Sequence, residues 1–121
     1  MGAEKRILVV DDDPLVKEMI KGHLESAGYD NLCFENSLQA MLFFRQNYKR
    51  IDLAIIDLVM PLMTGDEMAK KIHEIAPDSP ILGITGHPEM KKINGNIKKI
   101  MYKPIMREEL IRAVEELTSH A

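Results

Sequence analysis

A short apolar run that ends in a carboxylate constrains the fold more than any other feature of this sequence. Residues 53–56 read Leu-Ala-Ile-Ile, and Asp57 follows them directly. A run of this length with β-branched residues is typical of a strand that is buried on both faces, as in a parallel sheet. Met60-Pro61 then interrupts the regular backbone, and Gly65 precedes a stretch with helical spacing. We therefore expect Asp57 at the carboxyl end of a buried strand, where open α/β sheets bind ligands.

A second apolar run ends in the same way. Residues 7–10 read Ile-Leu-Val-Val, and Asp11, Asp12 and Asp13 follow. A single aspartate often does no more than cap or solvate a strand end, but two parallel strands bring several carboxylates to one edge of a sheet. Such charges raise one another's pKa and destabilise the fold unless a cation lies between them. A hard divalent ion with oxygen ligands meets this need, so the sequence predicts a Mg2+ site.

Strand and helix patterns alternate along the whole chain. This alternation predicts an α/β fold with a five-stranded parallel sheet, helices on both faces and right-handed crossovers. The expected strands cover residues 6–11, 30–34, 52–57, 80–85 and 97–102. The expected helices run from Pro14 to a stop at Gly28 and over residues 37–48, 65–75, 88–94 and 106–119.

Apolar residues at helical spacing predict which side of each helix is buried. In the first helix these residues are Leu15, Val16, Met19, Ile20 and Leu24, and in the second we expect Leu38, Met41 and Leu42 on the buried side.

Four of the five expected strands end in a group that can carry charge or donate a hydrogen bond: Asp11 with Asp12, Asp57, Thr85 and Lys103. Carboxylates, a hydroxyl and an ammonium around a Mg2+ site suit phosphoryl transfer, with a carboxylate as the nucleophile. The sequence contains neither G-x-x-x-x-G-K-[ST] nor G-x-G-x-x-G, so we do not expect a bound nucleotide.

Over about residues 5–119 the sequence resembles the receiver domain of bacterial-type response regulators. The resemblance is carried by Val-Val-Asp-Asp at 9–12, by D-x-x-M-P-x-x-x-G from Asp57 to Gly65, by Thr85 and by Lys103-Pro104. It implies a single receiver domain over residues 1–121 with a flavodoxin-like fold. In that fold the doubly wound five-stranded sheet has the order 2-1-3-4-5 and five helices, of which the fourth is shortened here.

The resemblance also implies how the site works. Asp57 would accept a phosphoryl group from a histidine kinase or a histidine phosphotransfer protein. Asp12 and Asp57 would ligate Mg2+, Asp11 would support the ion through water, and the backbone carbonyl of Val59 would complete the protein ligands.

Thr85 and Lys103 would bind the phosphoryl oxygens. Their rearrangement would shift the domain to an active conformation that changes its contacts with an unknown downstream protein. The resemblance thus implies a signalling protein, a monomer or a phosphorylation-dependent dimer. It would not be an enzyme, because it catalyses only its own phosphorylation and dephosphorylation.

The sequence departs from the family pattern near the end of the last strand. Family members commonly carry Tyr or Phe three residues before the lysine, where this chain has Ile100. We expect Tyr102 to point to the other face of the strand and not to replace that aromatic residue. The interval from Thr85 to Lys103 is also shorter than is usual, so we expect an abbreviated helix over residues 88–94.

Two positions beside the site bear on the lifetime of a phosphoryl group. Val59 has no side chain that orients a hydrolytic water, which suggests slow self-dephosphorylation. His87 either orients such a water or is only an exposed loop residue, and the sequence leaves both interpretations open.

The composition argues against binding of nucleic acid or a membrane and against an internal disulfide. The 121 residues carry a net charge of -3, which gives no electrostatic case for binding nucleic acid or a membrane surface. The single cysteine, Cys33, excludes an internal disulfide and fits a reducing compartment. No apolar run approaches the ~20 residues of a membrane span, so we expect a cytoplasmic protein.

Two alternatives remain from the sequence. Asp11 and Asp13 have the D-x-D spacing of haloacid-dehalogenase-like phosphatases, although the residues that follow do not match that motif. The second alternative is a receiver-like module that binds partners but no longer cycles phosphate.

Overall fold

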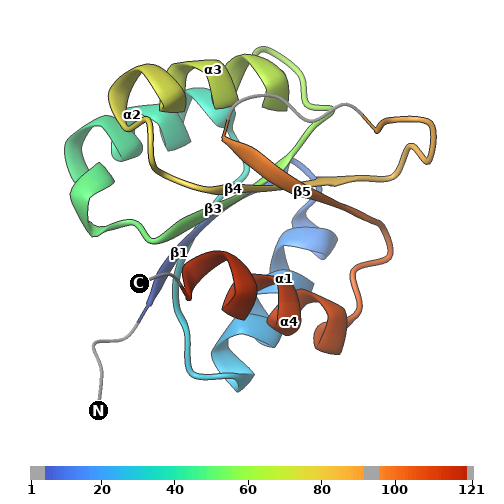
Figure 1. The fold of residues 1–121 in the computed structure, drawn as a ribbon. Coiled ribbons are helices and arrows are strands. Elements are labelled where there is room, and N and C mark those ends of the chain that lie inside the picture. The colour runs from blue at the N-terminus through green and yellow to red at the C-terminus, as the bar shows by residue number, and fades with distance from the viewer. Residues whose placement is uncertain (1–4, 92–95, 120–121) are drawn as a thin grey trace.

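A five-stranded parallel sheet forms the centre of the molecule (Figure 1). The structure, a computed structural model, describes residues 5–91 and 96–119. Its strands follow the spatial order β2-β1-β3-β4-β5, and every neighbouring pair is parallel. They are β1 (Arg6–Val10), β2 (Asp30–Phe34), β3 (Leu53–Asp57), β4 (Ile81–Thr85) and β5 (Ile97–Tyr102). The predicted doubly wound, flavodoxin-like topology is therefore confirmed.

The described residues contain four α-helices where the sequence predicted five. These helices are α1 (Pro14–Ser26), α2 (Ser37–Asn47), α3 (Gly65–Ile75) and α4 (Arg107–Thr118), and a short 3-10 helix, η1 (Tyr48–Arg50), follows α2. Residues 86–91 form turns instead of the start of the helix predicted over 88–94, and residues 92–95 lie outside the described part. Pro88 disfavours a helical conformation at His87, and the Met90 N–H donates to the His87 carbonyl in a turn (3.0 Å).

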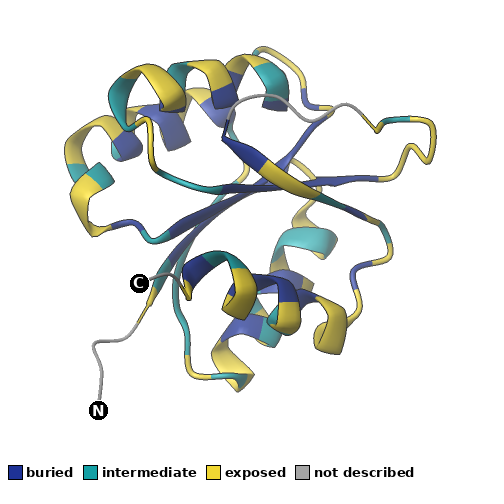
Figure 2. Ribbon diagram, in the orientation of Figure 1, coloured by how far each residue is buried: buried dark blue, intermediate teal, exposed yellow. Residues whose placement is uncertain are grey.

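The helices cover the sheet in two layers. In Figure 1, α2 and α3 lie on one side of the sheet, and α1 and α4 lie on the other. Alternate strand residues face opposite layers. Leu8 and Val10 of β1 belong to the apolar cluster under α2 and α3. Ile7 and Val9 belong to the cluster under α1 and α4. The central strands are consequently buried along their length (Figure 2).

Side-chain caps set the starts of three helices. The Asp13 carboxylate accepts from the Leu15 N–H (2.9 Å), and Pro14 occupies the first position of α1. Asn36 caps α2, and Thr64 forms a reciprocal capping box with Glu67 at α3. The third carboxylate of the Asp-Asp-Asp run is thus committed to a helix end.

The prediction for the buried side of α2 is wrong at two of three positions. Met41 is buried, but Leu38 is 51% exposed and Leu42 is 60% exposed. Ala40 and the larger Phe44 take the inner positions instead. Burying the Phe44 ring removes more apolar surface from water than burying a leucine, which selects this rotation of the helix.

On α1 the apolar stripe is also only partly buried. Leu15 is 79% exposed and Met19 is 46% exposed, whereas Ile20 and Leu24 are buried against the sheet.

Candidate functional site

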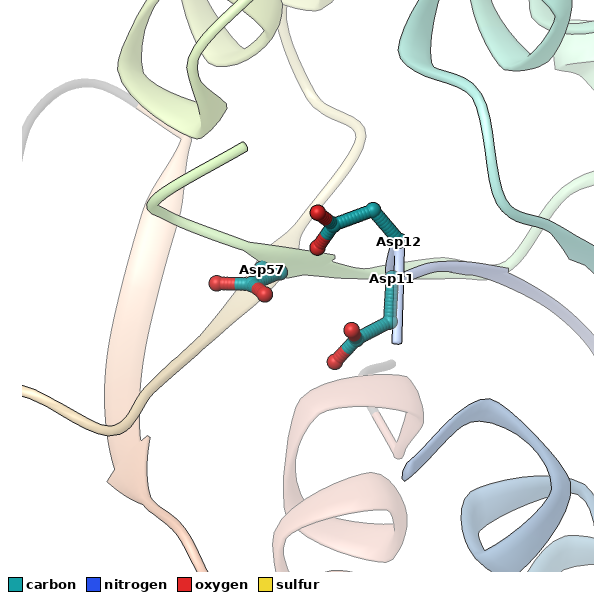
Figure 3. A group of neighbouring side chains, drawn as sticks. All are labelled: Asp11, Asp12 and Asp57. Atoms are coloured by element: carbon teal, nitrogen blue, oxygen red, sulfur yellow. The ribbon is translucent and has the colours of Figure 1, made fainter. Parts of the chain in front are cut away.

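Three carboxylates meet at the carboxyl edge of the sheet. Asp57 is the last residue of β3, and Asp11 and Asp12 follow the neighbouring strand β1. One carboxylate oxygen from each residue lies within 4.8 Å of the others. Figure 3 shows the three side chains converging at the ends of these strands. Asp11 and Asp57 are buried and Asp12 is exposed, so the cluster opens to solvent on the Asp12 side.

Lys103 directly follows the edge strand β5, and its side chain reaches this cluster. Its Nζ lies 3.0 Å from Oδ2 of Asp57 and 3.1 Å from Oδ2 of Asp11. The Lys103 backbone N–H donates to the Thr85 carbonyl (2.8 Å), which anchors the start of the side chain at the end of β4. A Cβ at Gly86 would lie 3.9 Å from Lys103 Cδ, so the lysine stem passes beside this glycine. One ammonium therefore bridges two of the three carboxylates.

Burial and charge act in opposite directions on these groups. Burial raises the pKa of Asp11, and the charge of Asp57 raises it further, against the lowering effect of the Asp13 N–H and Lys103. Burial alone would lower the pKa of Lys103, but its hydrogen bond to Asp57 and the charges of both carboxylates outweigh burial and raise it. Lys103 is therefore an ammonium at neutral pH, and it offsets only part of the negative charge around it.

The oxygen-rich cluster fits a hard divalent cation. Oδ1 of Asp11 accepts from the Asp13 N–H (2.9 Å). Oδ2 of Asp11 is buried and forms an ion pair with the Lys103 ammonium (3.1 Å), with no further hydrogen-bond partner among the described residues. A carboxylate oxygen with this one contact retains acceptor capacity for a water or a second cation. All three side chains offer the oxygen ligands that Mg2+ prefers.

The backbone after β3 holds the Asp57 carboxylate from a second side. The Val59 N–H donates to Oδ1 of Asp57 (3.0 Å), while Lys103 occupies Oδ2. The Val59 side chain is 44% exposed and does not contribute to this contact.

Gly65 supports the same loop by close packing. A Cβ at this position would lie 2.6 Å from Leu58 Cα and 2.7 Å from the Asp57 carbonyl oxygen. The sequence indicated Gly65 only as the start of a helix. Its packing role depends on an approach between α3 and β3 that no local pattern reveals.

Thr85 lies at the end of β4 and is fully buried. Its Oγ1 accepts from the His87 N–H (3.1 Å). The hydroxyl acts as an acceptor in this bond, so its own hydrogen can be donated to another oxygen.

The expected orientation of Tyr102 is wrong. Ile100 packs against the apolar cluster under α2 and α3, and Met90 packs against the same cluster. The Tyr102 hydroxyl donates to the Met90 carbonyl (2.7 Å). Tyr102 therefore lies on the same side of β5 as Ile100, as residues two apart in a strand should, and it contacts the segment between β4 and β5.

Two histidines have partners outside the carboxylate cluster. His87 is exposed, with Nδ1 3.3 Å from a Glu89 carboxylate oxygen. His73 is exposed but makes a side-chain hydrogen bond to the buried Asn96. Within residues 5–91 and 96–119, the Asp11, Asp12 and Asp57 group is the one cluster of three His, Cys, Asp or Glu residues with metal-ligand spacing.

Together, the doubly wound sheet and an acidic cluster with a bridging lysine at its carboxyl edge define a flavodoxin-like α/β domain with a candidate cation site. The family model described as "Response regulator receiver domain" matches residues 7–115. The chain therefore belongs to the response regulator receiver domain family, the signalling domains of two-component systems.

Relatives and solved structures agree with this assignment. The chain is 32% identical over 118 residues to the response regulator receiver protein CpdR of Brucella abortus, covering 93% of this chain and 96% of CpdR. A response regulator receiver domain protein from Clostridium thermocellum superposes with a TM-score of 0.89 at 26% identity, covering 95% of this chain and 94% of that one.

A third comparison, at 23% identity, bears on the fold alone. It is the receiver domain of the sensor histidine kinase PA1611 from Pseudomonas aeruginosa, whose structure has a magnesium ion coordinated in the active site cleft. The TM-score is 0.87, with coverage of 98% of this chain and 100% of that one. Some relatives are longer: the chain spans 50% of the response regulator MprA of Mycobacterium sp..

No helix in the described part of the chain combines the length and apolar character needed to cross a bilayer.

Proposed function

We propose that this chain is a phosphoacceptor in which Asp57 takes a phosphoryl group from a histidine kinase or a histidine phosphotransfer protein. The observation that carries the proposal is the setting of Asp57. It is 4% exposed, it lies at the carboxyl edge of the sheet, and both of its oxygens are held by donors, Val59 N–H and the Lys103 ammonium. A carboxylate held in one orientation is ready for in-line attack on phosphorus.

The transfer step balances with the groups present. An oxygen of Asp57 forms a bond to phosphorus while the bond from phosphorus to the donor's imidazole nitrogen breaks. The electron pair leaves with that nitrogen, which then takes up a proton, and the product is an acyl phosphate on Asp57. Lys103 offsets the charge of the phosphoryl oxygens, and the Thr85 hydroxyl donates to one of them.

The acidic cluster would hold the metal that this chemistry uses. Asp12 is exposed and has an oxygen directed into the cluster, so it would ligate Mg2+ together with Asp57 and the Val59 carbonyl. Asp11, whose Oδ1 accepts from the Asp13 N–H and whose Oδ2 faces Lys103, would support the ion through water. When bound, Mg2+ supplies positive charge between carboxylate and phosphoryl oxygens.

Signalling would follow from a change in the hydrogen bonds and ion pairs of Lys103 and Thr85. Lys103 contacts Asp57 directly, and its backbone pairs with Thr85, whose hydroxyl is in turn bonded to the His87 N–H. A phosphoryl group on Asp57 would compete for the Lys103 ammonium and the Thr85 hydroxyl. It would thereby bias the loop after β4 and change contacts with a downstream protein, whether the chain is a monomer or dimerises on phosphorylation.

The direct test is phosphorylation by a small donor. The protein is incubated with Mg2+ and acetyl phosphate, and its intact mass is compared with that of an Asp57→Asn variant. We expect one added phosphoryl mass in the native protein only. Addition to neither protein would favour a module that binds partners without cycling phosphate, and addition to both would assign the acceptor to Asp11, Asp12 or Asp13.

The time course after donor removal tests the proposed slow self-dephosphorylation, which rests on the Val59 side chain. A phosphoryl lifetime of seconds in the purified protein would contradict it. A His87→Ala variant with a longer lifetime than the native protein would assign the water-orienting role to His87.

A further inference from the structure

An open groove runs between α2 and α3, on the side of the sheet away from α1 and α4. Its volume is about 430 Å³. Leu38 of α2 and Leu62 and Met63 of the loop before α3 form its apolar part. The charged residues of α3 that line it are Glu67, Lys70, Lys71 and Glu74.

The apolar part of the groove is unusually exposed. Leu38 is 51% exposed and Leu62 is 75% exposed, and Leu42, one turn after Leu38 on α2, is 60% exposed. Single exposed leucines are common on protein surfaces, but apolar side chains gathered beside a groove with a polar rim mark interaction sites.

Leu62 also adopts a backbone conformation that leucine rarely takes. Its φ is 72°, in the left-handed region where glycine and asparagine are favoured. A glycine or asparagine would relieve this strain and would remove an exposed apolar side chain from water. Neither folding nor solubility favours a leucine at this position, so Leu62 is a candidate contact residue for a partner at the groove.

The charges on α3 indicate which kind of partner the groove accepts. Glu67, the adjacent pair Lys70 and Lys71, and Glu74 follow one side of the helix at spacings of three and four residues, in the order negative, positive, negative. The complementary helix carries a basic residue, an acidic pair and a basic residue, beside apolar residues that pack on Leu38 and Leu62.

The same charge order disfavours a second copy of this chain. A two-fold axis that pairs the α3 helices antiparallel would place Glu67 against Glu74 and set the lysines of the two copies against one another. Each of these pairs is repulsive, which argues against a second copy of this chain paired in this way.

We propose that the groove between α2 and α3 docks an amphipathic helix of another protein, with apolar anchors on Leu38 and Leu62 and a basic-acidic-basic order along α3. The groove contains no residue of the carboxylate cluster, so this docking does not depend on phosphoryl transfer. The loop that begins at Leu58 nevertheless joins Asp57 to Leu62, which places the surface next to the proposed acceptor.

Two synthetic helical peptides of equal composition test the proposal on the unphosphorylated chain. Both are constrained by side-chain bridges and carry leucines at positions i and i+4. One has the order Lys-Glu-Glu-Lys along its polar side, and the other has Glu-Lys-Lys-Glu. In a titration followed by 15N-1H correlation spectra, we expect the first peptide to bind at least fivefold more tightly. Its shift changes should centre on Leu38, Leu62, Met63 and the α3 charges.

Variants locate the binding on the groove. Leu38→Ser should weaken the first peptide at least fivefold, whereas Leu15→Ser, at a more exposed leucine on the opposite side of the sheet, should leave its affinity unchanged. The double variant Lys70→Gln with Lys71→Gln should bring the affinities of the two peptides within a factor of two.

Four results would overturn the proposal. They are equal affinity of the native chain for both peptides, shift changes centred on another surface, dimerisation of the chain that Leu38→Ser abolishes, and unchanged spectra in the presence of either peptide.

Discussion

Replacing Gly65 with alanine should destabilise the protein even though alanine is the better helix former. The new methyl carbon would lie 2.6 Å from Leu58 Cα and 2.7 Å from the Asp57 carbonyl oxygen, against 3.4 Å for an ordinary contact. Both neighbours are backbone atoms of the segment that carries the proposed phosphoacceptor, so the clash cannot be relieved by a side-chain rotation. The segment would have to move by about 0.8 Å to bring the closer of these two contacts to an ordinary distance.

The magnitude follows from two opposing effects. Overpacking of this kind costs about 1–3 kcal/mol. The gain in helix propensity from glycine to alanine is at most about 1 kcal/mol, and it is smaller at the first position of a helix. We therefore expect Gly65→Ala to lower the free energy of unfolding by about 1–2 kcal/mol.

A matched glycine provides the control. Gly22 lies in α1, and a Cβ there would meet nothing within 4 Å. Gly22→Ala should raise the free energy of unfolding by about 0.5–1 kcal/mol, because only the propensity gain remains. Urea denaturation of both variants measures the difference. If Gly65→Ala proved as stable as Gly22→Ala, the close approach of α3 to the end of β3 would be refuted.

The remaining predictions concern charge, thiol reactivity and backbone strain. Burial raises the pKa of Asp11 above its ordinary value of 3.8. Protonated Asp11 therefore stabilises the folded state below pH 3.8, and this stabilisation is lost as the pH rises through the folded-state pKa. Without Mg2+, Asp11→Asn should therefore be more stable than the native protein at pH 7, by urea denaturation, and should lose this advantage near pH 3.5. Adding Mg2+ at about 100 times its dissociation constant should stabilise the native protein by about 2.7 kcal/mol, and Asp12→Asn should respond less; equal responses would remove Asp12 from the ligand set. Burial raises the pKa of Cys33 to about 11, so iodoacetamide at pH 8 should alkylate it at least about tenfold more slowly than a free thiol, measured by mass. Leu62→Asn should raise the free energy of unfolding by about 1 kcal/mol, because asparagine tolerates the left-handed backbone; a loss of stability would contradict the inferred strain.

The arrangement of the carboxylates at one sheet edge followed from local sequence patterns. Apolar runs that end in Asp11 and Asp57 predict buried parallel strands, and parallel strands bring their carboxyl ends to the same edge. The structure brings carboxylate oxygens of Asp11, Asp12 and Asp57 within 4.8 Å of one another and adds Lys103, which follows β5. The chemical roles of these residues stay predictions.

What the sequence alone determined is the order of elements, because alternation, turns and helix caps are signals carried by neighbouring residues. The tertiary structure decided which side of α2 is buried: Leu38 and Leu42 satisfy the helical spacing, but Phe44 competes for the inner positions and lies on a different side. It also decided that Tyr102 contacts Met90 and that Gly65 must lack a side chain. These outcomes depend on distances between residues that are far apart in the chain. The packing of the helix and sheet layers sets these distances, so a local sequence pattern does not predict them.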